Sequence, residues 1–307
     1  MKIKTFVTIS AVAVALVSCG NSPETKQNEK KYSYQLCELN CPVQSLEQRV
    51  YNAYGSYGDV VKGDLLAEGF IAEFNQVGNV VIIVQYDENW NPKQVVTSKY
   101  DEDDNLIEEI ARSNDGKQIS RVAKEYNDEG ELIKWTEYNE NDEVKSYSTK
   151  EYEGGYQVKS TTVGEVETVK QCKRDGEIIL EHSTYEDGKL VEVVQYSKYD
   201  PKGVVEYVVY DPYGVKTKEF YARYNDKEET VEKRSHDFGT GRDYEYKAER
   251  NDKGHIIHSY TSNNGSEYEG YYEYEYDSKG NWIKRIEYWL NGKAKHPVTI
   301  VERAIKY

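Results

Sequence analysis

Runs of Tyr and aliphatic residues, interrupted by short clusters of Asp, Asn and Gly, fill most of this chain. The clearest example is 274–286, which reads YEYDSKGNWIKRI. Its two flanks favour a pleated, half-covered surface because they are rich in Tyr, Ile and Trp. Between them, Asp277 suits the first position of a type I turn, and Gly280 suits the bulge residue that takes a positive φ. The stretch therefore predicts a β-hairpin.

The same pattern recurs along the chain with a regular period. Close copies lie at 126–130, 199–203, 210–214 and 250–254, and weaker copies lie at 74–78, 86–90, 100–104, 138–142 and 224–228. Successive turns lie alternately about 12 and about 14 residues apart, so two strands make a repeat of about 26 residues. One strand between each pair of turns predicts roughly 18–20 antiparallel strands, connected as a hairpin meander.

Composition limits how this sheet can pack. The hydrophobic fraction of 37% includes 30 Tyr residues. Without them about 27% remains, which is too little for a well-filled sandwich of this size. Strands such as 132–136 and 144–147 also do not separate an apolar face from a polar one. We therefore expect an all-β fold built as an elongated or curled single sheet, stabilised by Tyr and aliphatic pairs across strands and without a deep core.

The first residues have the features of a targeting segment. Two lysines precede the apolar run Phe6–Val17, which is too short to span a bilayer. The run ends in Leu16-Val17-Ser18-Cys19, which resembles the lipobox of bacterial lipoproteins. This resemblance implies that Cys19 is lipidated and begins the mature chain. An ordinary signal peptide with an incidental Cys is the alternative.

These features divide the chain into a lipoprotein signal peptide (1–18), a lipidated Cys with a flexible tether (19–31) and a β-repeat domain (32–307). The tether is polar and has no apolar periodicity. The lipid predicts attachment to a membrane and a location in the cell envelope. Gly20, in place of Asp, favours the outer membrane under the sorting rule of such lipoproteins, and leaves open the periplasmic or the surface face.

The charge excludes one class of partner. The formal net charge is −15, and removal of Lys2 and Lys4 with the signal peptide takes it to −17. Because nucleic-acid phosphates attract basic surfaces, we expect no nucleic-acid partner. The same charge keeps the domain away from anionic bilayers except through its lipid.

Three cysteines remain after Cys19. An oxidising envelope permits a disulfide between Cys37 and Cys41, with Cys172 left over, and free thiols throughout are the alternative. The spacing of Cys37 and Cys41, without a nearby partner His or Cys, does not indicate zinc.

Candidate chemistry is sparse elsewhere, and we predict no catalytic residue, no metal and no cofactor. His255 and His258 are three residues apart, which places them on opposite faces of a strand. Turn geometry already explains the many Asp and Asn residues, and a catalytic carboxyl needs a desolvated pocket. A glycine-rich phosphate loop is absent from the sequence.

Aromatic residues near the C-terminus are the main candidates for binding. They are Tyr268, Tyr271, Tyr272, Tyr274, Trp282, Tyr288 and Trp289. Exposed rings stack on sugars or anchor a protein partner. The alternative, which we favour, is that these rings form cross-strand pairs that substitute for a core.

The unit at 276–285, with the pattern Tyr-Asp-x-x-Gly-Asn-Trp-x-Lys-Arg, resembles the YD or RHS-type repeat. It is more closely similar to the YD-repeat lipoproteins of Bacteroidetes, as are the ending Val301–Tyr307 and the entry at 42–45 and 57–64. The resemblance covers nearly all of the mature chain and implies a β-repeat architecture without implying an activity. Large RHS shells enclose a toxin, but we expect none here because the repeats are few.

These observations lead to two functional hypotheses. The first is a non-enzymatic lipoprotein of the cell envelope that presents an extended β-repeat surface to a protein partner. The alternative is a glycan-binding surface lipoprotein that uses the exposed Tyr and Trp residues. An envelope hydrolase using turn carboxylates is a weaker third hypothesis.

Overall fold

The computed structural model describes residues 33–307, apart from 57–58, 67–68, 201 and 292–293. The expected signal peptide, Cys19 and the whole tether lie outside the described residues. One short helix, α2 (Ser33–Leu36), precedes an antiparallel sheet of 21 strands in the described part of the chain. The strands are β1 (Ser45–Ser56), β2 (Asp59–Leu65), β3 (Phe70–Phe74), β4 (Val80–Tyr86), β5 (Pro92–Tyr100), β6 (Leu106–Ser113), β7 (Gln118–Tyr126), β8 (Leu132–Tyr138), β9 (Val144–Glu153), β10 (Tyr156–Val163), β11 (Thr168–Asp175), β12 (Ile178–Glu186), β13 (Lys189–Tyr199), β14 (Val204–Tyr210), β15 (Lys216–Tyr224), β16 (Thr230–Asp237), β17 (Arg242–Arg250), β18 (Ile256–Asn263), β19 (Ser266–Tyr276), β20 (Trp282–Asn291) and β21 (Ala294–Lys306).

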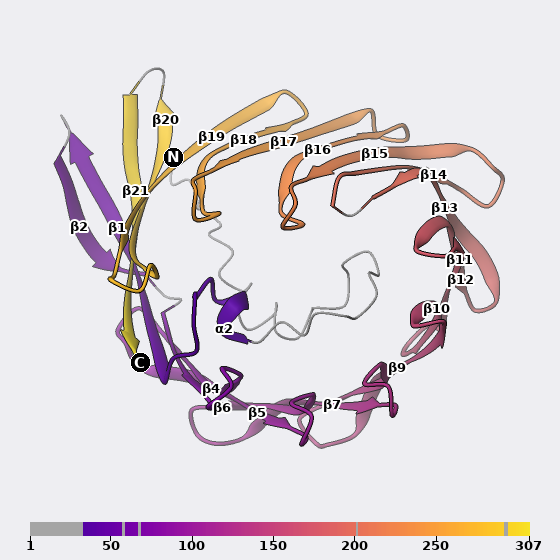
Figure 1. Ribbon diagram of the computed structural model, residues 1–307, viewed down its shortest axis with the longest axis horizontal. Coiled ribbons are helices and arrows are strands. Elements are labelled where there is room, and N and C mark those ends of the chain that lie inside the picture. Colours follow the sequence, from indigo (N-terminus) through magenta and orange to yellow (C-terminus); the bar gives the residue numbers. More distant parts are fainter. Residues whose placement is uncertain (1–32, 57–58, 67–68, 201, 292–293) are drawn as a thin grey trace.

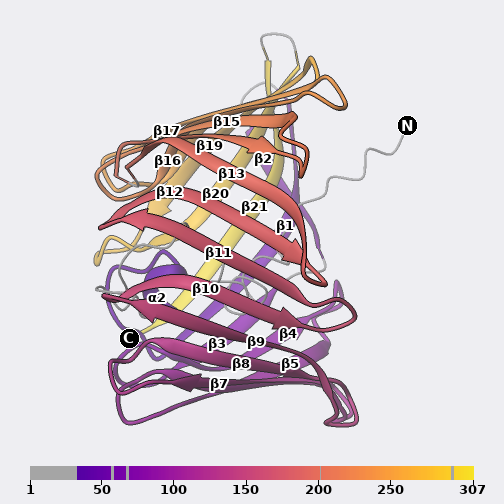
Figure 2. The same ribbon diagram turned by 90° about the vertical axis from the view of Figure 1, so that its right-hand side faces the viewer.

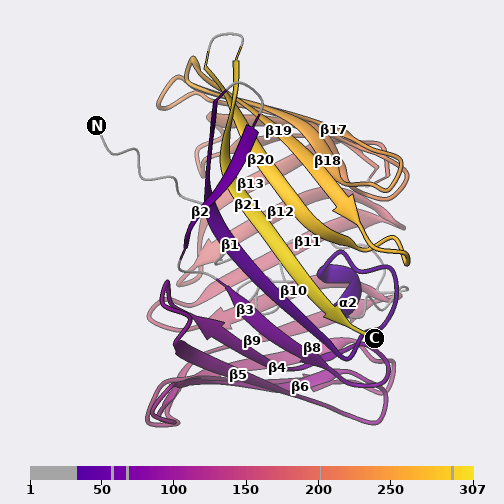
Figure 3. The same cartoon turned by 90° about the vertical axis from the view of Figure 1, so that its left-hand side faces the viewer.

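The sheet closes on itself as a barrel. Along one edge, β1 pairs with β21 from Ser45↔Lys306 to Asn52↔Thr299. Along its other edge, β1 pairs with β3 through the first half of β1 and with β2 through the second half of β1. From β3 to β21 each strand pairs with the next, so 20 strands form the closed ring and β2 lies beside β1 (Figure 1). Figures 2 and 3 show the strands crossing the wall at a slant, as closure of a barrel requires.

The predicted all-β, antiparallel hairpin meander is confirmed, but the expectation of an elongated or curled single sheet is wrong, because the sheet closes into a barrel. The physical reason is that closure depends on β1 and β21, which stand at opposite ends of the domain. Leu46 faces Ile305, and Val50 faces Val301, so the first and last strands match apolar side chains as well as backbone groups. Neither strand carries a local signal for the other, because register between distant strands is set by tertiary pairing.

The predicted turn chemistry accounts for the local structure. Asp277 Oδ1 accepts hydrogen bonds from the backbone N–H groups of Lys279 and Asn281, and Gly280 has a φ of 81°. Four weaker copies of the turn hold a non-glycine residue at the corresponding position, also at positive φ, namely Trp90, Asp104, Asp142 and Glu228. The period therefore persists where glycine is missing, because the surrounding strand pairs hold the turn in place.

The recurring Tyr of the repeat fastens one hairpin to the previous one. The hydroxyl groups of Tyr100, Tyr126 and Tyr152 donate to the carbonyl oxygens of Val80, Leu106 and Leu132, each 20 residues earlier. Burial raises the pKa of Tyr126 to about 12, so this donor stays protonated at neutral pH. Each such bond satisfies a carbonyl at the start of a neighbouring strand.

The inner face of the ring is identified by what packs on it. Cys37, Leu39 and Val43 form one buried cluster with side chains of β1, β3, β4 and β5, including Leu46 and Ile83. Figure 1 shows α2 inside the ring beside these strands. Since successive residues of a strand alternate between faces and cross-strand partners share a face, the register assigns every strand residue to the inner or the outer wall.

A pair of cysteines across the seam between β1 and β21 tests closure. Glu47 and Ala304 are cross-strand partners on the outer wall, at a separation that suits a disulfide. We expect the double variant Glu47→Cys/Ala304→Cys to form this disulfide on mild oxidation, detected as a linked peptide by mass spectrometry.

The matched control is Glu47→Cys/Lys284→Cys, in which the second cysteine lies one strand further round the ring on β20. An open sheet would separate Glu47 from Ala304 by the whole width of the sheet. Absence of the linked peptide from the first variant would therefore contradict the closed barrel.

Candidate functional site

Residues 33–44, which we call the inner segment, bridge the seam of the barrel from within. On one side, the Tyr34 N–H donates to Gly78 O at 3.0 Å, in the turn between β3 and β4. On the other side, the Asn40 N–H donates to Asn281 Oδ1 at 2.7 Å, in the turn before β20. The inner segment therefore connects the β3–β4 end of the sheet with the β20–β21 end, and β1 joins the same two ends in the wall.

Arg303 is the charged centre of this contact. Its guanidinium donates to Gln48 Oε1 at 2.9 Å and to Cys37 O at 3.0 Å, and it lies 3.4 Å from the ring centroid of Trp282. Burial lowers the pKa of Arg303 to about 9, while Glu38 acts in the opposite direction. The group therefore remains charged at neutral pH, and its hydrogen bonds compensate for lost hydration.

Trp282 is part of the same contact and is no surface residue. It is 1% exposed, and its indole N–H donates to Glu38 at 2.8 Å. Tyr274 packs edge-on against its ring, and the Tyr274 hydroxyl donates to Ile256 O. Burial raises the pKa of Tyr274. Trp282 therefore holds the inner segment in place and cannot offer a face to a ligand, and Tyr274 supports its ring.

The structure does not bring the seven predicted aromatics together on one surface. Tyr271 and Tyr288 face each other on the outer wall, where their hydroxyls donate to Glu269 and Glu273. The inner wall carries the other members, Tyr268, Tyr272, Tyr274, Trp282 and Trp289. Of the seven, Tyr268 at 64% and Trp289 at 46% are strongly exposed, so these two remain as candidates for binding.

Cys37 and Cys41 are free thiols in the structure. Cys37 is buried in the cluster under the inner segment, whereas Cys41 and Cys172 are half-buried. Burial raises the pKa of the Cys37 thiol to about 11, and Arg303 acts in the opposite direction. The predicted Cys37–Cys41 disulfide is therefore not present in this arrangement.

Aromatic rings in contact cover a sector of the inner wall that sequence reasoning missed. Tyr196, Tyr207 and Phe220 are cross-strand partners on β13, β14 and β15. The ring centroids of Tyr207 and Phe220 lie 4.6 Å apart with nearly parallel planes. Such pairs fill the wall in place of a core, as expected for a Tyr-rich sheet. The signal in the sequence was weak because each strand contributes one ring.

His182 adjoins these rings and lies in a positive environment. Its Nδ1 is 3.2 Å from the Tyr196 hydroxyl, and its cross-strand partners are Cys172 and Val194. Burial, together with the cations Arg174 and Lys170, lowers the pKa of His182 to about 4. His182 is therefore neutral at neutral pH.

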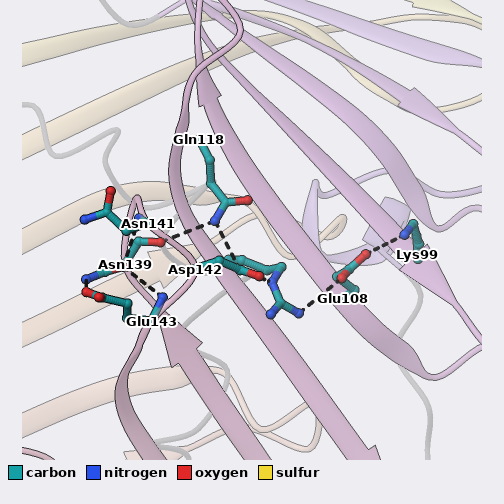
Figure 4. A network of polar contacts seen from close by, with 8 residues as sticks. Lys99, Glu108, Gln118, Asn139, Asn141, Asp142 and Glu143 are labelled. Carbon is teal, nitrogen blue, oxygen red and sulfur yellow. Dashed lines mark hydrogen bonds and ion pairs between the residues drawn. The ribbon is translucent and has the colours of Figure 1, made fainter.

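The outer wall is covered by ladders of ion pairs. Figure 4 shows Lys99 beside Glu108 on the neighbouring strand, and Asp142 beside Gln118. The Lys99–Glu108 distance is 2.6 Å, and Arg121 lies 3.5 Å from Glu108 and 2.7 Å from Asp142. Further pairs on this wall are Lys134–Glu125, Lys159–Glu151, Arg223–Glu232, Lys247–Glu245 and Lys284–Glu275.

These ion pairs make the outer wall a polar, charged surface. The Lys99 side chain is 68% exposed, and pairs of this kind contribute at most about 1 kcal/mol each. Their effect is to neutralise charge along the outer wall. Among the described residues, no group of His, Cys, Asp and Glu side chains is placed to hold a metal ion. No helix in this part of the chain combines the length and hydrophobicity needed to cross a bilayer.

Comparisons with known proteins give weak structural likenesses. A porin-like protein from Bacteroides uniformis has 10% sequence identity and a TM-score of 0.36, over 86% of this chain and 98% of that one. A porin-like protein from Bacteroides vulgatus has 9% identity and a TM-score of 0.23 over the same shares. The structure of TcdB2-TccC3 with Cdc42 has 11% identity and a TM-score of 0.29, and 81% of this chain matches 15% of that one.

At these identities and TM-scores, the likenesses carry no inference about function. No protein-family model matches the chain. A search of curated proteins gives no match either. The resemblance to YD-repeat lipoproteins therefore stays a prediction.

His182 makes stability depend on pH. Its pKa is about 4 in the folded protein, against about 6.5 when unfolded, so the unfolded chain binds more protons between these values. The stabilisation is complete above pH 6.5 and is lost as the pH falls toward 4. The free energy of unfolding of wild type should therefore fall between pH 7 and pH 4. We expect this fall to be about 3 kcal/mol smaller in His182→Gln, measured by urea denaturation at the two pH values. Parallel pH dependences for wild type and variant would contradict the burial of a neutral His182.

Proposed function

We propose that this chain is a non-enzymatic lipoprotein of the cell envelope, attached through lipid on Cys19, whose barrel presents a binding surface to a protein partner. The observation that carries the proposal is the free edge of β2. Closure of a barrel removes strand edges, and a free edge is a site where another chain adds a strand. Within the described residues, β2 pairs with β1 alone, whereas each strand of the ring has partners on both sides.

The side chains around this edge support a protein partner. Val61 is 58% exposed and its cross-strand partner Tyr54 is 56% exposed. On the opposite face, Lys62 pairs with Glu302 at 2.9 Å and lies over the Tyr51 ring. An added strand would therefore gain backbone hydrogen bonds together with an apolar contact beside Val61.

The rim that carries the β1–β2 hairpin is also the more apolar end of the barrel. In a meander every second turn lies at the same rim, which groups the turns β14–β15, β16–β17, β18–β19 and β20–β21 with the β1–β2 turn. Tyr213 at 91%, Val215 at 60% and Phe238 at 44% are exposed at two of these turns. Exposed apolar groups gathered at one end favour contact with a partner.

The outer wall supports a barrel surrounded by water. A barrel that spans a membrane presents an apolar band to lipid, and charged residues in that band are unfavourable by about 2–4 kcal/mol each at the bilayer midplane. Here the outer wall carries charged pairs such as Lys159–Glu151 and Lys284–Glu275. We therefore propose attachment at the outer membrane by the lipid rather than by the strands.

Photo-crosslinking from the free edge tests the proposal. We expect benzoylphenylalanine in place of Val61 to crosslink one discrete envelope protein in living cells. The matched control places the same group at Ile178, which is 49% exposed at the start of β12, on the other side of the ring. The same band from both positions, or none from Val61, would contradict a partner at β2.

Binding of a glycan is a second candidate, favoured by the exposure of Tyr268 and Trp289. Both lie on the inner wall near the apolar rim, on the adjacent strands β19 and β20. Each ring that stacks on a sugar contributes about 0.5–1.5 kcal/mol, so we expect Trp289→Ala to weaken retention in polysaccharide gels by about threefold to tenfold.

The control for this experiment is Tyr288→Ala, which removes the adjacent ring on the opposite face of the same strand. Unchanged retention of Trp289→Ala, or equal loss in both variants, would reject glycan binding at this rim. Trp282→Ala is unsuitable because Trp282 is buried in the seam.

A further inference from the structure

An uncharged sector of the inner wall lies beside the apolar rim, on β17 to β20. It consists of three cross-strand rows, which follow one another from the rim into the barrel. The rows are Tyr244–Asn263–Ser266, Tyr246–Thr261–Tyr268 and Ala248–Ser259–Gly270–Trp289. Their members are aromatic, hydroxyl, amide, alanine or glycine residues, so none of them carries a charge. The charged or titratable residues at the borders of the sector are Arg242 at the rim, Glu287 further into the barrel, Lys233 on β16 and His296 on β21.

The outer face of the same strands is charged. On β17 and β19 it carries residues such as Asp243, Glu245, Lys247, Glu267 and Glu269. Charged residues make up 31% of the chain. An inner face without charge over four neighbouring strands is therefore a local feature that composition does not explain.

Three rings of the uncharged sector are open to a ligand. Tyr268 is 64% exposed, Trp289 is 46% exposed and Tyr244 is 36% exposed. In the part of the chain that the structure describes, no other ring and no cation stacks on these three side chains. They differ in this respect from Tyr207 and Phe220, which cover each other at 4.6 Å.

Polar groups lie between and beside these rings. The hydroxyl groups of Ser259 and Tyr272 are 3.3 Å apart. Both lie over Gly270, where a Cβ would stand 3.0 Å from Ser259 Oγ and 2.8 Å from the Tyr272 hydroxyl oxygen. Glycine at this position therefore leaves room for a pair of hydroxyl groups beside the Trp289 ring, since Gly270 is the cross-strand partner of Trp289.

We propose that the uncharged sector binds an uncharged polysaccharide. The inference rests on the second candidate of the proposed function and names the class of its ligand. Sugar rings stack on exposed aromatic faces, and their hydroxyl groups exchange hydrogen bonds with hydroxyl and amide side chains, which both donate and accept. An anionic polysaccharide would meet no cation within the three rows and would be repelled by a chain of net charge −15.

The three open rings stand on different strands, which favours a polymer over a single sugar. Tyr244 lies on β17, Tyr268 on β19 and Trp289 on β20. Neighbouring strands are about 4.8 Å apart, so the sector extends about 14 Å across the sheet from β17 to β20. Several sugar units in a row are needed to contact all three rings.

Polymers matched in backbone and different in charge test the inference. The probes are hydroxyethylcellulose and carboxymethylcellulose, which share a glucan backbone, and galactomannan as a second uncharged backbone. We expect affinity electrophoresis of the full-length protein to show retardation by at least one uncharged polymer and none by carboxymethylcellulose. Added salt should leave the retardation unchanged, because no charge pair contributes to it.

Tyr244 provides the variant that is specific to this inference. We expect Tyr244→Ala to weaken binding of the uncharged polymer by about threefold to tenfold, whereas Tyr244→Phe, which keeps the ring, should retain most of the binding. The matched control is Tyr260→Ala, which removes a ring from the outer face of neighbouring β18, where its hydroxyl donates to Glu267. This control should bind as wild type does.

The outcomes separate this inference from the proposals on which it builds. Equal retardation by carboxymethylcellulose, full binding by Tyr244→Ala, or equal weakening by Tyr260→Ala would overturn the uncharged sector as the site, and weaker retention of Trp289→Ala would still support a glycan at the rim. Absence of retardation by both uncharged polymers would overturn the inference as well. Crosslinking from Val61 reports on a different surface, so the protein partner at β2 stands or falls independently.

Discussion

Pairing between the first and last strands is the constraint on which the rest of this structure depends. Without it, β1 and β21 would be two open edges of a long sheet, each with unpaired backbone groups. With it, the sheet gains an inside and an outside. The inner segment can then lie across the seam, where Arg303 connects Gln48 of β1 with Cys37 of the segment and stacks on Trp282. Closure and the small buried core therefore stabilise each other.

The two walls of the barrel differ in the side chains that cover them. Ion pairs such as Lys99–Glu108 neutralise the outer wall and leave it suited to water. The inner wall carries one sector packed by the inner segment and another lined with aromatic rings. The free edge of β2 lies outside this closed system, since β1 has a second half that β3 does not reach. The barrel thus offers distinct surfaces rather than one uniform repeat face.

Much of the fold could be predicted because its information is local. A turn such as 277–281 depends on one carboxylate, two nearby N–H groups and one residue at positive φ, all within five residues. The candidate site could not be predicted in the same way. Strand alternation separates Tyr271 from Tyr272, but only closure decides which of the two lies on the inner wall, and only the packing at the seam buries Trp282.

The sequence by itself determined the strands, the turns and the antiparallel meander. Only the tertiary structure decided that the sheet closes, which face is inner, and which rings remain exposed. The physical reason is the range of the interactions. Turn geometry and hairpin register act between neighbours along the chain, whereas the pairs Leu46–Ile305 and Val50–Val301 join residues from opposite ends of the domain. No local pattern records that such distant strands have matching lengths, faces and register.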